Sequence, residues 1–225
     1  MNGATVVFDL DGTMIDTGPD LTAALNHVLR RLDLPQAAPE DVRPVVGLGA
    51  RAIIECALAK RGHAIDAGAL EVHLDSFLAY YRQNIAVRST PFPGFETALA
   101  GLAAEGFRLA VCTNKREDLA VKLLKEMRLA QHFHAIAGGD TFPKRKPDPG
   151  HLLGAIALAG GVAQRAVMVG DSRPDVAAAR AAGVPIIAVS FGYAGEPLEN
   201  LQPDLVLHHF DDLRRAVGSL LARRS

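Results

Sequence analysis

Four aspartates occupy positions at which paired carboxylates could do chemistry. Asp9 and Asp11, separated by one leucine, directly follow the apolar run 5–8, while Asp171 and Asp175 follow a later apolar run. Carboxylates that gather at one place can bind a hard cation such as Mg²⁺, attack as nucleophiles or exchange protons with a substrate. The spacing therefore predicts an acidic site, provided that the fold brings the two pairs together.

Hydrogen-bond donors and one lysine lie between the two acidic pairs in the chain. Thr113 and Asn114 follow the apolar run 109–112, and Lys146 precedes a helical pattern. A hydroxyl and a backbone N–H donate hydrogen bonds to phosphoryl oxygens, and an ammonium offsets their negative charge. Each motif alone has an ordinary explanation, because Asp and Thr often cap helices and lysines are common at surfaces. Four motifs together, at strand ends and helix starts, favour a shared functional site over four unrelated helix caps.

The elements that must position these residues alternate between strands and helices. Six short apolar runs have strand character: 5–8, 109–112, 135–137, 166–169, 186–189 and 205–207. Helical patterns, such as 117–127 and 175–182, separate most of them. This alternation predicts an α/β fold with a doubly wound, Rossmann-like parallel sheet. Ligands bind beyond the carboxyl ends of the strands in such a sheet, so the four motifs are expected at one edge.

One segment interrupts the alternation. About a hundred residues separate the first two strands, far more than a crossover connection needs, and 20–32, 51–60 and 70–82 have helical patterns within that segment. We therefore expect an all-helical cap domain at 16–86, inserted into a Rossmann-like core that comprises 1–15 and 87–225.

Composition argues against several classes of partner. The 225 residues carry 24 Lys and Arg against 25 Asp and Glu, and this near neutrality, with only sparse arginine pairs, argues against nucleic-acid binding. The longest uncharged stretch, 149–164, is shorter than the ~20 residues of a membrane span, so no membrane partner is expected. Cys56 and Cys112 support neither a disulfide framework nor a thiolate metal site. Without a basic, then apolar, leader pattern, the chain is expected in the cytoplasm, as a monomer or homodimer.

The motifs make the chain resemble the phosphatases of the haloacid dehalogenase superfamily, over nearly its whole length. They read Asp9-Leu10-Asp11-Gly12-Thr13, Thr113-Asn114-Lys115, Lys146-Pro147-Asp148-Pro149 and Gly170-Asp171-Ser172-Arg173-Pro174-Asp175. Within the superfamily, the phosphoglycolate phosphatase family is the most similar. That likeness rests on 16–21, 46–50, 138–140 and 191–193. Two positions depart from the family pattern: Arg116 replaces the usual proline, and Thr17 replaces the commoner serine.

The resemblance implies a Mg²⁺-dependent hydrolysis of a small anionic phosphoester, above all of 2-phosphoglycolate to glycolate and phosphate. In this reading Asp9 is the nucleophile that forms an aspartyl-phosphate, and Asp11 protonates the departing alkoxide and then activates water. Asp9, Asp171 and the backbone carbonyl of Asp11 would hold Mg²⁺, with Asp175 supporting the metal ligands from behind.

The remaining motif residues are expected to bind substrate. Thr113 and Asn114 would donate hydrogen bonds to the phosphoryl group, and Lys146 would neutralise its charge. The inserted helices would choose the leaving group, with Gly47–Arg51 as the candidate segment. There Arg51 could clamp a carboxylate bidentately or be an ordinary solvated helix residue.

Several alternatives stay open at this point. Other small phosphates, such as sugar phosphates or pyrophosphate, fit the same motifs, as does a phosphosugar mutase. A non-enzymatic phosphoacceptor signalling domain also gathers acidic residues, a threonine and a lysine, but it needs no acid beside the acceptor and no inserted helices. A dehalogenase has no use for Asp11 or a metal. The glycines at 47–52 match a loose dinucleotide fingerprint, but no adequate strand precedes them.

Overall fold

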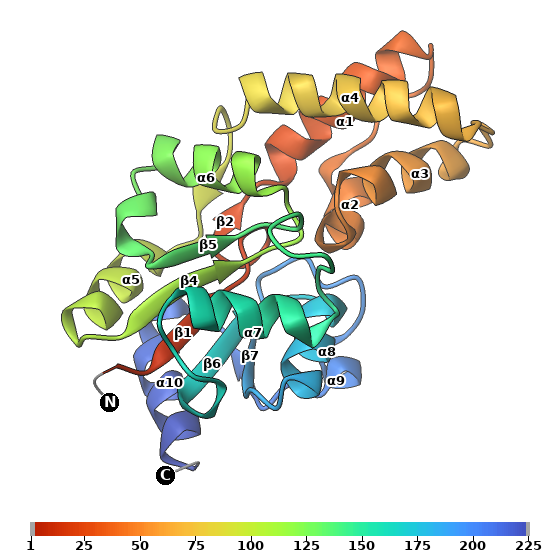
Figure 1. The fold of residues 1–225 in the computed structure, drawn as a ribbon. Coiled ribbons are helices and arrows are strands. Elements are labelled where there is room, and N and C mark those ends of the chain that lie inside the picture. The colour runs from red at the N-terminus through yellow and green to blue at the C-terminus, as the bar shows by residue number, and fades with distance from the viewer. Residues whose placement is uncertain (1–2, 224–225) are drawn as a thin grey trace.

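The centre of the fold is a six-stranded sheet in which every neighbouring pair of strands is parallel (Figure 1). The computed structural model describes residues 3–223. The strand order is β5-β4-β1-β6-β7-β8. These strands are β1 (Thr5–Phe8), β4 (Arg108–Cys112), β5 (Ala135–Ala137), β6 (Ala166–Gly170), β7 (Ile186–Val189) and β8 (Leu205–Leu207). The predicted fold class is confirmed, and each expected strand is present within one residue of its predicted bounds.

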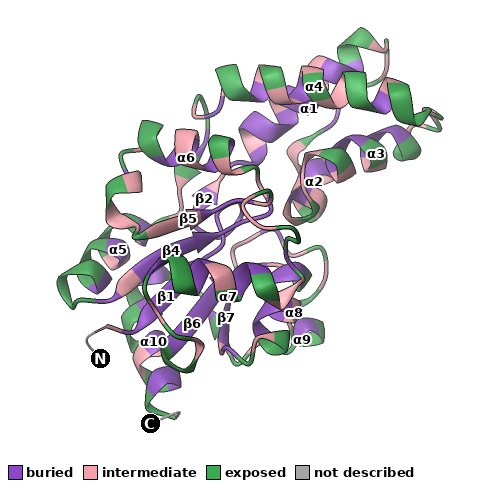
Figure 2. Cartoon of the chain, in the orientation of Figure 1, coloured by how far each residue is buried: buried purple, intermediate pink, exposed green. Residues whose placement is uncertain are grey.

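Helices cover both faces of this sheet, which explains why its strands are continuously apolar. Successive side chains of a strand point to opposite faces, so Val6 and Phe8 join one buried cluster and Val7 joins the other. The first cluster includes side chains of α5 (Phe95–Ala104), α6 (Glu117–Glu126) and α10 (Leu213–Ala222). The second includes side chains of α7 (Pro149–Leu158), α8 (Arg173–Ala181) and α9 (Leu198–Leu201). Figure 2 shows the central strands buried between these layers.

Four helices lie beyond the carboxyl edge of the sheet, between β1 and β4 in the chain (Figure 1). These inserted helices are α1 (Gly18–Arg31), α2 (Pro39–Val42), α3 (Ala50–Lys60) and α4 (Ala67–Gln83). The apolar stripe of α1 packs against α4. Short 3₁₀ helices complete the chain: η1 (Arg43–Leu48), η2 (Ala130–His132), η3 (Ala163–Arg165) and η4 (Phe210–Asp212). The division into a core and a cap domain at 16–86 stays a prediction.

A two-stranded antiparallel ribbon joins the inserted helices to the sheet. It pairs β2 (Ile15–Asp16) with β3 (Thr90–Pro91). Each strand has only two residues, too few to show a periodic pattern in the sequence. The two chain passages leave and re-enter the core side by side.

The buried carboxylate of Asp20 fastens these two passages together. It accepts hydrogen bonds from the backbone N–H groups of Arg88 and Ser89 and, at 2.7 Å, from the Ser89 hydroxyl. Because Asp20 lies in the first turn of α1, these bonds hold the start of the inserted segment to its end. Within residues 3–223, no helix is long and apolar enough to cross a membrane.

Candidate active site

Three of the predicted carboxylates meet at the carboxyl edge of the sheet. Asp9 follows β1, Asp171 follows the adjacent strand β6, and Asp175 lies in the first turn of α8. One oxygen from each carboxylate lies within 4.8 Å of the other two, and all three residues are buried. The acidic site expected from the spacing therefore forms because β1 and β6 are neighbours.

Lys146 is the cation inside this acidic cluster. Its Nζ lies 2.9 Å from Asp9 Oδ1 and 2.6 Å from Asp175 Oδ1, and its side chain is buried. Burial raises the pKa of Asp9 to about 7, although Lys146 opposes the change, and burial together with Asp175 and Asp9 also raises the pKa of Asp171. Burial alone would lower the pKa of Lys146, but its carboxylate neighbours outweigh that effect and raise it. Three carboxylates facing one ammonium leave an excess of buried negative charge.

The donor set suits a hard divalent cation. Asp9 Oδ1 is buried, and the ammonium of Lys146 lies 2.9 Å from it. Asp171 is held in one orientation, since Thr13 Oγ1 donates to its Oδ1 at 2.8 Å and the backbone N–H of Tyr193 to its Oδ2 at 2.7 Å. Oriented carboxylate oxygens with uncompensated charge are the ligands that Mg²⁺ prefers.

Asp175 uses both oxygens to hold other parts of the site. Its Oδ1 accepts from Lys146, while its Oδ2 accepts from the hydroxyl of Ser172 at 2.6 Å and from the Ser172 backbone N–H at 3.0 Å. The bond from the Ser172 backbone N–H also belongs to the capping box at the start of α8. The arrangement supports the prediction that Asp175 holds the metal ligands in place without binding the metal itself. This role stays a prediction.

Glycines allow the loops of the site to approach one another closely. Gly12 has φ +81°, and a Cβ there would lie 2.6 Å from Asp171 Oδ2. A Cβ at Gly192 would lie 2.3 Å from the Cβ of Asp171. A larger residue at either position would force the neighbouring groups, Asp171 among them, to shift.

Asp11 has partners different from those of the three clustered carboxylates. Lys115 Nζ lies 2.8 Å from its Oδ1 and 2.9 Å from its Oδ2, and the Thr17 hydroxyl donates to Oδ1 at 2.6 Å. The Lys115 side chain is only 5% exposed. The sequence analysis did not select Lys115, although its position in the motif Thr113-Asn114-Lys115 at a strand end was the available signal.

Thr113 and Asn114 lie beside the acidic cluster because β4 is the other neighbour of β1. Both are buried. Thr113 Oγ1 accepts a hydrogen bond from the Lys115 backbone N–H at 3.2 Å. The Asn114 side-chain amide donates to the carbonyls of Gly47 and Lys146, at 3.0 and 3.1 Å, and so links the inserted segment to the core.

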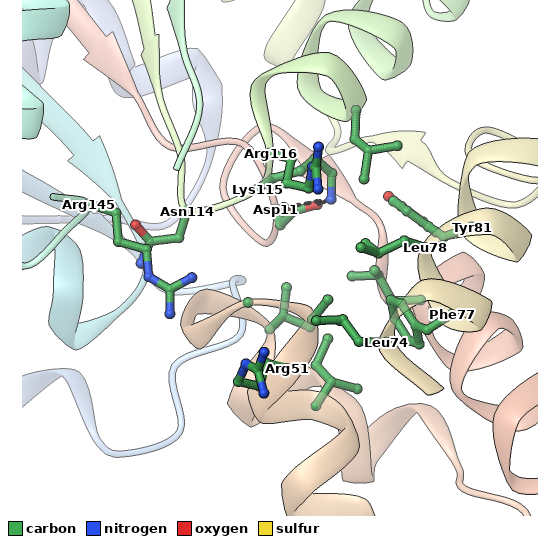
Figure 3. A pocket seen from close by; sticks show the side chains of 16 residues that line it. Asp11, Arg51, Leu74, Phe77, Leu78, Tyr81, Asn114, Lys115, Arg116 and Arg145 are labelled. Atoms are coloured by element: carbon green, nitrogen blue, oxygen red, sulfur yellow. Dashed lines mark hydrogen bonds and ion pairs between the residues drawn. The ribbon is translucent and has the colours of Figure 1, made fainter. Parts of the chain in front are cut away.

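A cavity of about 220 Å³ lies between the inserted helices and the core (Figure 3). Asp11 is the one carboxylate among its lining residues, which include the cations Arg51, Lys115, Arg116 and Arg145. Arg51 stands across the cavity from Lys115 and forms an ion pair with Glu71, and its side chain is 43% exposed. A role for Arg51 in substrate binding therefore stays a prediction.

The chain belongs to the haloacid dehalogenase-like hydrolase family, whose model matches residues 6–189. This confirms the resemblance inferred from the motifs. The chain is 46% identical over 221 residues to a phosphoglycolate phosphatase of Caulobacter vibrioides, covering 98% of this chain and 93% of that protein. It is 44% identical over 223 residues to a phosphoglycolate phosphatase of Mesorhizobium japonicum, covering 99% of this chain and 98% of that protein.

A solved structure shows the same architecture. The crystal structure of a predicted phosphoglycolate phosphatase from Haemophilus somnus superimposes with a TM-score of 0.90 at 28% identity, covering 96% of this chain and 98% of that one. The family and the fold are therefore established, whereas the roles of the individual site residues stay predictions.

Proposed function

We propose that this protein is a Mg²⁺-dependent phosphatase that hydrolyses 2-phosphoglycolate to glycolate and phosphate through an aspartyl-phosphate. The observation that carries the proposal is the buried cluster of Asp9, Asp171 and Asp175 around Lys146, with Asp11 two residues from Asp9 on the wall of a cation-lined cavity. The names of the relatives support the choice of substrate. A cavity of about 220 Å³ suits a small leaving group.

The two aspartates of the first motif divide the chemistry. A carboxylate oxygen of Asp9 attacks phosphorus, so that an Asp9–phosphoryl bond forms while the bond from phosphorus to the glycolate oxygen breaks. Asp11 gives its proton to the departing glycolate oxygen. It then takes a proton from the water that attacks the aspartyl-phosphate, which releases inorganic phosphate and restores Asp9.

The other motif residues stabilise the phosphoryl group. Lys146, already within 2.9 Å of Asp9, offsets the charge of the phosphoryl oxygens, and the Thr113 hydroxyl and Asn114 backbone N–H donate to them. Asp9, Asp171 and the backbone carbonyl of Asp11 would hold Mg²⁺. When bound, the cation supplies further positive charge to the transferring phosphoryl group. Asp175 keeps Lys146 and the metal-binding loop in place.

The inserted helices, which we propose as a separate domain at 16–86, select the leaving group. The core motifs meet only the phosphoryl group and the cation, whereas α3 and α4 line the cavity beyond Asp11. In this proposal, the residues of the inserted helices contact the leaving group and so determine which phosphoester is hydrolysed, while the core motifs perform the same chemistry on any of them.

A phosphate-release assay with Mg²⁺ tests the proposal. The substrates are 2-phosphoglycolate, several sugar phosphates and pyrophosphate, and Asp9→Asn is the inactive control. We expect 2-phosphoglycolate to have the highest kcat/KM and Asp9→Asn to lose about 10⁴-fold or more. Greater efficiency on a sugar phosphate would replace the proposed substrate, and activity retained by Asp9→Asn would remove the proposed mechanism.

A further inference from the structure

Lys115 is the most deeply buried of the cations on the cavity wall whose ion pairs the structure defines. Its side chain is 5% exposed, against 43% for Arg51 and 56% for Arg116. Both arginines face carboxylates at the surface, Glu71 for Arg51 and Asp118 with Asp140 for Arg116. Water and these counter-ions weaken the electrostatic attraction between the two arginines and an anion in the cavity. The charge of Lys115 is less screened because its side chain is buried.

Tyr81, on α4, has a buried hydroxyl with no hydrogen-bond partner among the described residues. The residue is 1% exposed, and Lys115 Nζ lies over its ring, 4.7 Å from the ring centroid. In Figure 3 the hydroxyl end of Tyr81 points towards Lys115 and Asp11. An unpaired buried hydroxyl is costly, and Tyr81 lines the cavity, so a ligand in the cavity is the natural acceptor for this O–H group.

The chemistry of the proposed substrate places its carboxylate near these two groups. In 2-phosphoglycolate a single CH₂ group carries both the bridging oxygen and the carboxylate. The group that protonates the bridging oxygen and the groups that bind the carboxylate must therefore be neighbours. Lys115 touches Asp11, at 2.8 and 2.9 Å, whereas Arg51 stands on the other side of the cavity (Figure 3).

We propose that Lys115 and Tyr81 together form the subsite for the leaving-group carboxylate. An ammonium has three N–H donors, and the two that face the oxygens of Asp11 leave one for the substrate. The Tyr81 hydroxyl supplies a second donor from the inserted helices. The same ammonium then holds Asp11 and the substrate carboxylate side by side, which places Asp11 next to the glycolate oxygen. This inference rests on the proposed function.

Three substrates separate the possible roles of the two residues. Ethyl phosphate has a methyl group in place of the carboxylate of 2-phosphoglycolate but still needs an acid for its alkoxide. An aryl phosphate such as p-nitrophenyl phosphate lacks this carboxylate, and its leaving group departs without a proton from an acid. The variants are Tyr81→Phe, which removes one hydroxyl from a buried ring, and Lys115→Met. Lys122→Met, on the exposed side of α6, is the matched control.

We expect Tyr81→Phe to lower kcat/KM for 2-phosphoglycolate about tenfold to a hundredfold, the effect of losing a hydrogen bond to a charged group, and to leave ethyl phosphate nearly unchanged. Lys115→Met should lose more on 2-phosphoglycolate than on ethyl phosphate. Lys122→Met should match the unmodified protein on all three substrates.

Two results would overturn the subsite. Equal losses on 2-phosphoglycolate and ethyl phosphate in Tyr81→Phe would make its hydroxyl structural, and this variant decides even if Lys115→Met fails to fold. A preference for 2-phosphoglycolate that survives both substitutions would also remove the subsite while leaving the proposed function intact. Failure of the proposed function looks different, because the unmodified protein itself would then hydrolyse ethyl phosphate as efficiently as 2-phosphoglycolate.

Discussion

At the scale of single residues, Asp9 and Asp11 have the same functional group but very different surroundings. Asp9 shares the ammonium of Lys146 with Asp175 inside the acidic cluster. Asp11 is bound through both oxygens, to Lys115 and Thr17. Asp9 therefore faces the acidic cluster, whereas Asp11 is oriented at the wall of the cavity.

This division of roles makes Asp11→Asn informative. The variant should lose about 10²-fold to 10⁴-fold in kcat for 2-phosphoglycolate, because the glycolate oxygen then leaves without a proton. With p-nitrophenyl phosphate, attack by Asp9 needs no acid, so a phosphoenzyme should accumulate. Mass spectrometry of acid-quenched protein would detect it. Asp9→Asn must give no such adduct, and a phosphoenzyme absent from Asp11→Asn would contradict the assigned base.

Asp171 and Asp175 should respond differently to Mg²⁺ titration. Asp171→Asn should raise the Mg²⁺ concentration for half-maximal activity at least tenfold, because we place this residue as a direct ligand. Asp175→Asn should shift it less and instead lower kcat at saturating Mg²⁺, because Lys146 loses a partner at 2.6 Å. Equal shifts in the two titrations would make Asp175 a direct ligand as well.

At the scale of elements, the ribbon β2–β3 and the first turn of α1 determine where the inserted helices stand. Asp20 receives the N–H groups of Arg88 and Ser89 at the point where the chain returns to the core. The bonds connect residues that are 68 and 69 positions apart, so they close the whole inserted segment into a loop.

Removing this connection should destabilise the protein. Asp20→Ala leaves the buried N–H group and hydroxyl of Ser89, and the partly buried N–H group of Arg88, without their acceptor, which should lower the free energy of unfolding by about 2–4 kcal/mol. Urea unfolding followed by circular dichroism would measure the loss. Asp75→Ala, at an exposed position of α4, is the matched control and should change the free energy by less than about 0.5 kcal/mol. Similar stabilities for the two variants would show that Asp20 does not fasten the segment.

At the scale of the whole molecule, the inserted helices and the core meet over the site. Gly47 accepts from Asn114, and the Tyr193 hydroxyl accepts from the Gly18 backbone N–H at 2.7 Å. Residues of both parts line the cavity. The cytoplasmic location, the monomeric or homodimeric state and the lack of nucleic-acid binding stay predictions.

The stability of the whole molecule should depend on pH through His151. This histidine is buried in α7, its Nδ1 accepts from the Lys146 backbone N–H at 3.1 Å, and burial and the nearby Lys146 charge lower its pKa to about 4. The unfolded chain binds this proton near pH 6.5 and the folded chain only near pH 4. Neutral His151 therefore makes its full contribution to the free energy of unfolding above pH 6.5. This contribution, at most about 3 kcal/mol, is lost as the pH falls to 4.

His151→Asn should flatten this acid limb, since its side-chain oxygen can accept the same bond without titrating. The measurement is the difference in unfolding free energy between the two proteins at several pH values. The raised pKa of Asp9 gives the opposite pH dependence, but it is the same in both proteins and cancels in this difference. Parallel pH profiles would mean that His151 does not titrate differently on folding.

The amino-acid sequence by itself determined the six strands, the main helices and the four motifs. These depend on local patterns: the runs 5–8 and 186–189 are apolar whichever residues surround them, and motifs at strand ends of a parallel sheet must meet at one edge. The expected order of helices 20–32, 51–60 and 70–82 likewise follows from short-range periodicity.

Only the tertiary structure decided which side chains meet in the cavity. Lys115 reaches Asp11 across 104 positions in the chain, and Asp20 reaches Ser89 across 69. The ribbon β2–β3 has two residues per strand, and the unpaired Tyr81 hydroxyl is one of many polar groups in an otherwise ordinary helix. Such contacts depend on how elements pack together, and no repeating local pattern accompanies them. The sequence therefore locates the acidic edge of the sheet, while the packing of the inserted helices decides that Tyr81 lies beside Lys115.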